Sequence, residues 1–157
     1  MTHVFRTLSL AAVFAGLIAT PLVASALQVG QQLTPAEQAA LGTGTRHTVA
    51  GATLRTFAGV SARSTDGANA TTVVDARGVV GTSRNEVLVS RVPTATVRAL
   101  APALTQARTT DYYDHMQMTS LRYATFADAV AARERLQAAL PAAQVTLPIQ
   151  YQARKPR

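Results

Sequence analysis

The chain has 157 residues, no cysteine, and 15 lysines and arginines against 8 aspartates and glutamates. The absence of cysteine excludes disulfides, thiolate metal sites and cysteine catalysis, so side-chain packing must stabilise the fold. The positive charge would suit an anionic partner, yet the arginines before the last residues are spread singly along the chain, a pattern typical of a solvated surface.

Residues 1–26 are predicted to be a secretory signal peptide. Arg6 precedes an apolar run from Leu8 to Val23, and Ala24-Ser25-Ala26 fits a small-residue cleavage site. The run is shorter than the roughly 20 apolar residues that span a bilayer. Cleavage would leave residues 27–157, with 14 basic and 8 acidic residues and a net charge of +6 (14 − 8). We expect this mature chain to be periplasmic or secreted, with no membrane segment.

Residues 27–83 are predicted to form an N-terminal extension of one short helix and several strands. Thr34 is a suitable N-cap for a helix from Pro35 to Leu41, with Glu37 as its capping-box partner. His47 falls in a glycine- and threonine-rich connection, so we expect a surface histidine. The strands are expected at Thr53–Val60, at Thr71–Asp75 and at Val79–Val80.

Residues 84–150 are predicted to form the organised domain, an α+β unit with the element order β-α-β-β-α-β. Pro102 should kink or split the first helix, which starts after Pro93. We expect a bulge between Met118 and Leu121, because the apolar residues of that strand change face there. The strands are expected at Glu86–Val92, Thr109–Tyr113, His115–Tyr123 and Gln144–Ile149, and the second helix at Thr125–Leu140.

The densest polar cluster is Asp111-Tyr112-Tyr113-Asp114-His115. Two carboxylates and an imidazole are able to hold a divalent cation, or to activate Ser120 as in a hydrolase. We interpret the cluster as a strand and turn, since aspartate favours turns and no hydrolase, metalloprotease or phosphate-loop motif accompanies it. The sequence therefore predicts no enzyme, no metal site and no cofactor. A hydrolase using His115 with Asp111 or Asp114 is the least favoured alternative.

The last seven residues differ in composition from the rest of the chain. They carry three basic side chains, one aromatic side chain and no acid. Terminal residues of this kind are often frayed and solvated. An extended basic peptide is also able to enter an acidic groove on a partner and to place its side chains in successive pockets. The residues are Tyr151, Gln152, Ala153, Arg154, Lys155, Pro156 and Arg157.

The element order, followed by an exposed C-terminal strand, resembles the ferredoxin-like propeptides and propeptide-like inhibitors of subtilisin-like proteases. Three local motifs and the N-terminal extension are more narrowly similar to the external chaperones of the kexin-like serine protease of Aeromonas. That family consists of exported, stand-alone, propeptide-like proteins of similar length. The motifs are the strand start Asn85-Glu86-Val87, the helix end Leu140-Pro141, and Val145-Thr146-Leu147-Pro148 before a basic tail.

This resemblance implies a secreted intermolecular chaperone and inhibitor of a subtilisin-like, or kexin-like, serine protease. The tail, residues 151–157, would insert into the active-site cleft, with Arg154 and Lys155 as candidates for acidic pockets. The ending Lys155-Pro156-Arg157 departs from the family pattern and leaves open which residue lies beside the catalytic serine. We expect no nucleic-acid partner and a monomer when free. The alternative is a periplasmic basic binding module associated with anionic envelope components.

Overall fold

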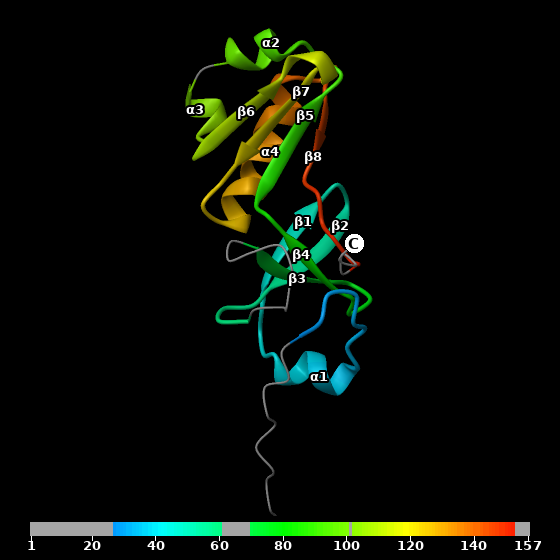
Figure 1. Cartoon of the computed structure of the whole chain (residues 1–157). Coiled ribbons are helices and arrows are strands. Elements are labelled where there is room, and N and C mark those ends of the chain that lie inside the picture. Colours follow the sequence, from blue (N-terminus) through cyan, green and yellow to red (C-terminus); the bar gives the residue numbers. More distant parts are fainter. Residues whose placement is uncertain (1–26, 61–69, 101, 153–157) are drawn as a thin grey trace, which may run out of the picture.

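The computed structural model describes residues 27–60, 70–100 and 102–152. Within these ranges, two four-stranded antiparallel sheets are stacked along the long axis of the molecule (Figure 1). The strand order is β1-β2-β3-β4 in the N-terminal sheet and β6-β7-β5-β8 in the C-terminal sheet. The predicted α+β class is confirmed. The expected signal peptide, residues 1–26, and tail residues 153–157 lie outside the described residues.

The N-terminal half combines one helix with an antiparallel meander. Helix α1 (Pro35–Ala40) begins with the predicted capping box. The Glu37 N–H donates to Thr34 Oγ1 at 3.3 Å, and the Thr34 N–H donates to a carboxylate oxygen of Glu37 at 2.7 Å, so two free backbone donors at the helix start are satisfied. The strands are β1 (Thr45–Val49), β2 (Ala52–Thr56), β3 (Thr71–Asp75) and β4 (Val80–Ser83).

The expected connection around His47 is wrong, because His47 lies in the middle of β1. A two-residue turn, Ala50-Gly51, joins β1 to β2, and both residues have positive φ, 50° and 82°. Such a turn matches the twist of a hairpin. Alanine rarely adopts this conformation, so nothing in the sequence indicated a hairpin turn at this position. Strand β2 ends at Thr56, earlier than expected, because the Val60 N–H donates to the Phe57 carbonyl in a turn.

The C-terminal half contains the predicted succession of strands and helices. The predicted first helix is divided into two short helices, and the second of them begins at Pro102, as expected. In order, the elements are β5 (Glu86–Ser90), α2 (Thr94–Arg98), α3 (Pro102–Thr105), β6 (Thr109–Tyr113), the 3-10 turn η1 (Asp114–Met116), β7 (Met118–Arg122), α4 (Phe126–Ala139) and β8 (Gln144–Thr146).

The expected bulge in the strand His115–Tyr123 is wrong. Residues 114–116 form the turn η1, and Gln117 takes a left-handed φ of 47°, so β7 starts only at Met118. Met118 then faces one side of the sheet and Leu121 the other by simple alternation, so no extra residue is needed. Strand β5 similarly ends before its expected limit, where Arg91 adopts a φ of 67°.

One hydrophobic core joins the two sheets. Val49, Leu54 and Val73 of the N-terminal sheet belong to the same buried cluster as the apolar side of the C-terminal sheet and the inner face of α4. Phe126 lies at the junction, where its ring meets the His47 ring edge-on at a centroid distance of 5.1 Å. Thr125 fixes the start of α4 by accepting the Asp128 N–H at 3.1 Å. The residues from the C-terminal half include Val87, Val89, Leu121, Ala129, Ala132, Leu136 and Val145.

Helix α4 packs on one face of the C-terminal sheet, behind the strands in Figure 1. Among the described elements, no helix covers the other face. The register places Leu88 of β5 between Ser120 of β7 and Thr146 of β8 on this uncovered face. We call it the open face. Its residues are Glu86, Leu88, Ser90, Thr109, Asp111, Tyr113, Met118, Ser120, Arg122, Gln144 and Thr146.

Candidate binding surface

The chain after β8 leaves the C-terminal sheet and runs down to the N-terminal sheet (Figure 1). There Gln150 forms a bridge with Thr82 of β4 through two backbone hydrogen bonds. The Gln150 N–H donates to the Thr82 carbonyl at 2.8 Å, and the Thr82 N–H donates to the Gln150 carbonyl at 2.9 Å. The segment before the predicted tail is therefore paired with a strand about 70 positions earlier, and it links the two sheets.

Tyr151, the first predicted tail residue, packs against two glycines of its own chain. A Cβ placed on Gly81 of β4 would lie 2.9 Å from Ile149 Cγ2 and 3.0 Å from the Tyr151 ring. A Cβ placed on Gly30 would lie 2.6 Å from the Tyr151 carbonyl oxygen. Gly30 must therefore be glycine for the Tyr151 backbone to lie where it does, and at Gly81 a larger residue would force the Ile149 and Tyr151 side chains to shift. We call Gly30, Gly81 and Thr82 the tail seat.

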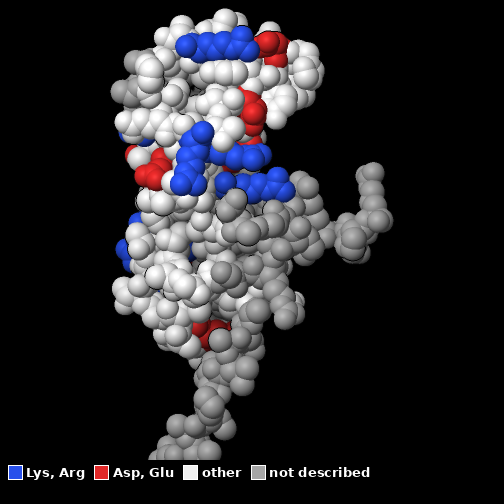
Figure 2. Space-filling view, turned by 60° about the vertical axis from the view of Figure 1, so that its left-hand side comes forward, with Lys and Arg blue, Asp and Glu red and all other residues white. Residues whose placement is uncertain are grey.

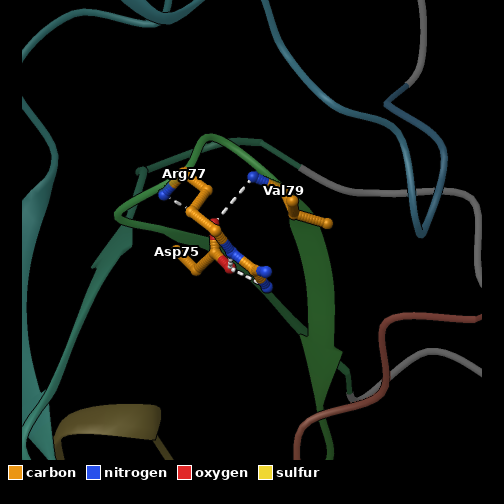
Figure 3. Close-up of polar contacts among 3 residues, drawn as sticks. All are labelled: Asp75, Arg77 and Val79. Atoms are coloured by element: carbon orange, nitrogen blue, oxygen red, sulfur yellow. Dashed lines mark hydrogen bonds and ion pairs between the residues drawn. The ribbon is translucent and has the colours of Figure 1, made fainter.

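The turn from β3 to β4, close to the tail seat, is fixed by Asp75 (Figure 3). One carboxylate oxygen accepts the N–H groups of Arg77 and Val79, both at 2.9 Å, and the other accepts the Arg77 side chain at 3.1 Å and 3.2 Å. Partial burial opposes ionisation of Asp75, but these hydrogen bonds and the Arg77 charge outweigh burial and lower its pKa. Asp75 is therefore a stable negative charge in the turn.

The electrostatic surroundings of Tyr151 keep its hydroxyl protonated. Burial raises the pKa of Tyr151, the negative charge of Asp75 raises it further, and the positive charge of Arg77 partly offsets both. The ring is thus held neutral and half-buried against the sheet. Gln152 is exposed, and the remaining predicted tail residues, Ala153, Arg154, Lys155, Pro156 and Arg157, lie outside the described residues.

The open face of the C-terminal sheet combines an apolar centre with two acids. Leu88 and Met118 are half-buried there, and Tyr113 keeps 37% of its surface exposed. Ser120 is almost fully buried, and its hydroxyl donates to a carboxylate oxygen of Glu86. Half-exposed apolar side chains with bonded polar neighbours are typical of a protein–protein contact surface.

The polar cluster from Asp111 to His115 is divided between β6 and η1. Asp114 accepts the Thr94 hydroxyl and lies 3.6 Å from the Arg98 guanidinium, which in turn stacks over the Tyr112 ring at 4.3 Å. These contacts attach α2 to the edge of the sheet, so they give Asp114 a structural role. Within the described ranges, no group of three His, Asp or Glu residues is close enough to hold a metal ion.

The arginines that are scattered in the sequence are partly gathered in space. Figure 2 shows arginine side chains collected midway along the molecule, a region that we call the waist. Three arginines lie at this end of the C-terminal sheet: the Arg108 N–H donates to the Arg122 carbonyl at 2.7 Å, Arg122 is the register partner of Glu86, and Arg84 precedes that strand by two positions. We call Arg84, Arg108 and Arg122 the waist arginines.

His47 makes the stability of the sheet junction sensitive to pH. Burial lowers the pKa of His47, and its Nε2 lies 3.0 Å from the Thr56 hydroxyl. Below pH 6.5 the His47 imidazole therefore binds a proton more strongly in the unfolded chain than in the folded chain. The free energy of unfolding should fall as the pH drops through this range. We expect the urea midpoint to decline more between pH 7.5 and pH 5 in the wild type than in His47→Gln. Equal declines in the two proteins would contradict this role.

Sequence reasoning missed the tail seat. Gly81 stands inside the run Val79-Val80-Gly81-Thr82, and a glycine within a strand pattern often marks a close approach of another backbone. That signal was present, but it does not say which segment approaches. Gly30 carried no comparable signal, because its role depends on a residue about 120 positions away.

No helix of the described residues is long and apolar enough to cross a membrane. Comparisons of the chain with protein-family models, with curated proteins and with solved structures found no match. A functional conclusion therefore depends on the geometry of the open face and of the tail seat.

Proposed function

We propose that this protein is a secreted intermolecular chaperone and inhibitor of a subtilisin-like serine protease. The observation that supports this most is the C-terminal sheet, with strand order β6-β7-β5-β8, helix packing on one face and an open second face. This strand order and the β-α-β-β-α-β succession support the ferredoxin-like arrangement that the sequence resemblance implies. The propeptides of subtilisin-like proteases, which the sequence resembles, use the same arrangement.

The open face is the surface that would dock on the protease. Its apolar centre, Leu88 and Met118 with Tyr113 beside them, would be covered by the partner, and Glu86 and Asp111 would lie at the border of the contact. A ligand that binds the native protease and not its unfolded chain stabilises the native state in proportion to its concentration and affinity. Docking of the open face would thus favour folding of the protease without any catalysis by this chain.

The tail would close the protease cleft at the same time. An extended peptide places alternate side chains in successive pockets of a groove, and its positive charge suits a groove that selects basic residues. Arg154 and Lys155 are the candidates for these pockets, and Pro156 would make the bond after Lys155 a poor substrate. The tail leaves the described fold at Gln152, directly after the tail seat.

A chain that ends at Gln152 tests this proposal. It keeps every described contact of Gln150 and Tyr151 and removes only residues 153–157. With a secreted subtilisin-like protease expressed without its propeptide, we expect inhibition of peptide hydrolysis to weaken at least tenfold, the loss typical of removing interface side chains worth more than about 1.4 kcal/mol. A full-length variant with Arg154, Lys155 and Arg157 changed to glutamine separates charge from backbone. Full inhibition by the shortened chain would show that the tail has no such role.

The waist arginines favour a second candidate, a periplasmic module that binds anionic envelope polymers. Exposed Arg108 and Arg122 at one end of a sheet form a local positive surface. Under this alternative, retention on an immobilised polyanion should fall with added salt. The double variant Arg108→Gln, Arg122→Gln should lose that retention, whereas Arg46→Gln, an exposed arginine of β1, should keep it. Equal retention of both variants would exclude the waist arginines as the binding surface.

A further inference from the structure

The C-terminal segment, residues 149–151, packs against strand β4. Gln150 pairs with Thr82 through two backbone hydrogen bonds, which fixes the direction of the segment along β4. Ile149 and Tyr151, two positions apart on an extended chain, both place side chains over Gly81. Strand β4 thus packs against the side chains of Ile149 and Tyr151 at Gly81, and its backbone pairs with Gln150, the residue between them.

A second segment closes the other side of Tyr151. The Gly30 N–H donates to the Val80 carbonyl at 2.8 Å, and the Val80 N–H donates to the Gln31 carbonyl at 2.8 Å, so the turn around Gly30 is itself attached to β4. Gly30 has a φ of 86° and lies against the Tyr151 carbonyl, where a side chain would collide. Tyr151 therefore lies between β4 and this turn, with its ring on Gly81 and its backbone on Gly30.

We propose that Tyr151 is a positioning residue, held by the N-terminal sheet so that the chain reaches Gln152, from which the tail continues, at a fixed place on the protein. The part of the tail that meets a partner then begins after Tyr151, and Tyr151 itself stays on its own chain. This inference rests on the proposed function for the identity of the partner. It also gives the N-terminal half of the chain a function, the presentation of the tail.

The advantage of such an anchor is entropic. A terminal segment that is free in solution must be ordered when it binds, and fixing one residue lowers a binding constant by about fivefold to thirtyfold. Residues 149–151 are already fixed by the hydrogen bonds to Thr82 and by the two glycines. A partner that binds the tail would then not have to order residues 149–151, so the anchored tail should bind more tightly than the same peptide on a free tether.

The variant Gly81→Ala tests the anchor on the free protein. Its methyl group would lie 2.9 Å from Ile149 Cγ2 and 3.0 Å from the Tyr151 ring, so these side chains must shift and the pairing of this segment with β4 should weaken. We expect hydrogen exchange at the Gln150 amide to become at least tenfold faster, with no change at the Leu121 amide of the central strand β7. A chain that ends at Pro148 is the matched background: there the same substitution meets no segment, and alanine should keep or raise the urea midpoint.

A second pair of variants tests the anchor independently, in case Gly81→Ala does not fold. Tyr151→Ala removes the ring from the seat and should speed exchange at Gln150 in the same way. Tyr151→Phe keeps the ring and should leave exchange near the wild-type rate. Unchanged protection of Gln150 in both Gly81→Ala and Tyr151→Ala would overturn the anchor.

Inhibition of a subtilisin-like protease separates the anchor from the proposed function. If wild type inhibits, Gly81→Ala and Tyr151→Ala should weaken inhibition about tenfold, and Tyr151→Phe should not. Full inhibition by the two weakened-anchor variants, together with fast exchange at Gln150, would overturn the positioning role while leaving the proposed function intact. If wild type inhibits no subtilisin-like protease, the proposed function fails, and the exchange data alone decide whether Tyr151 is anchored.

Discussion

Replacing Phe126 with alanine is expected to lower the free energy of unfolding by about 3–5 kcal/mol, the range for removing a buried aromatic side chain. Phe126 is only 3% exposed and begins α4, the helix that packs on the C-terminal sheet. Its ring also meets His47 of the N-terminal sheet at 5.1 Å. Alanine would therefore leave a cavity where the two sheets share their core. Urea unfolding followed by far-ultraviolet circular dichroism measures the loss.

The conservative variant Phe126→Leu separates volume from ring contact. Leucine keeps most of the apolar contact and should cost about 1–2 kcal/mol, because partial filling limits the cavity term. Since Val49, Leu54 and Val73 belong to the same core cluster as Val87, the wild type should unfold in one transition by circular dichroism and by tyrosine fluorescence. Two separate transitions, or a loss below about 1 kcal/mol in Phe126→Ala, would show that Phe126 does not couple the sheets.

The helices were predictable because their signals are local. Thr34 and Glu37 form a capping box within four residues, and at the start of α4 Thr125 accepts the Asp128 N–H. Proline adds a second local signal, since Pro102 begins α3 where the sequence predicted a break. Such features depend on neighbours in sequence, so they need no knowledge of the tertiary fold.

The strands were less predictable, because what stabilises them lies elsewhere in the chain. Strand β1 exists because it pairs with β2 across a turn in which Ala50 takes a conformation that sequence statistics disfavour. The phase change in the Met118 region required no bulge, because both faces of β7 accept apolar side chains. Apolar side chains on both faces of one strand remove the alternation on which strand prediction depends.

The candidate site shows the same division between local and distant information. The abrupt composition of residues 151–157 is visible in the sequence, whereas the packing of Tyr151 on Gly81 joins positions 70 residues apart. The waist arginines likewise are distant in sequence and meet only because β5, β6 and β7 are neighbours in one sheet. Composition therefore predicted a binding segment, and strand pairing shows that its first residue, Tyr151, already packs on the N-terminal sheet.

Replacing Leu88 with lysine is expected to weaken inhibition of a subtilisin-like protease about a hundredfold, a loss typical of a central contact residue. Leu88 lies at the centre of the open face, between Ser120 and Thr146 on the neighbouring strands. A lysine there would place an ammonium group where the proposed contact excludes water. The half-buried position and the nearby Glu86 carboxylate should let the stem and charge be accommodated in the free protein, so the urea midpoint should change little.

Ala138→Lys is the matched control for Leu88→Lys, because it adds the same charge at an exposed position of α4, on the opposite side of the sheet. It should inhibit like the wild type if the open face is the docking surface. Comparable losses in both variants would mean that net charge, and not the open face, governs binding. Unimpaired inhibition by Leu88→Lys would leave the tail as the sole contact with the protease.

A combined variant, Leu88→Lys in the chain that ends at Gln152, should then lose no more inhibition than the shortened chain alone. If the open face and the tail are two independent contacts, the two losses of inhibition should multiply.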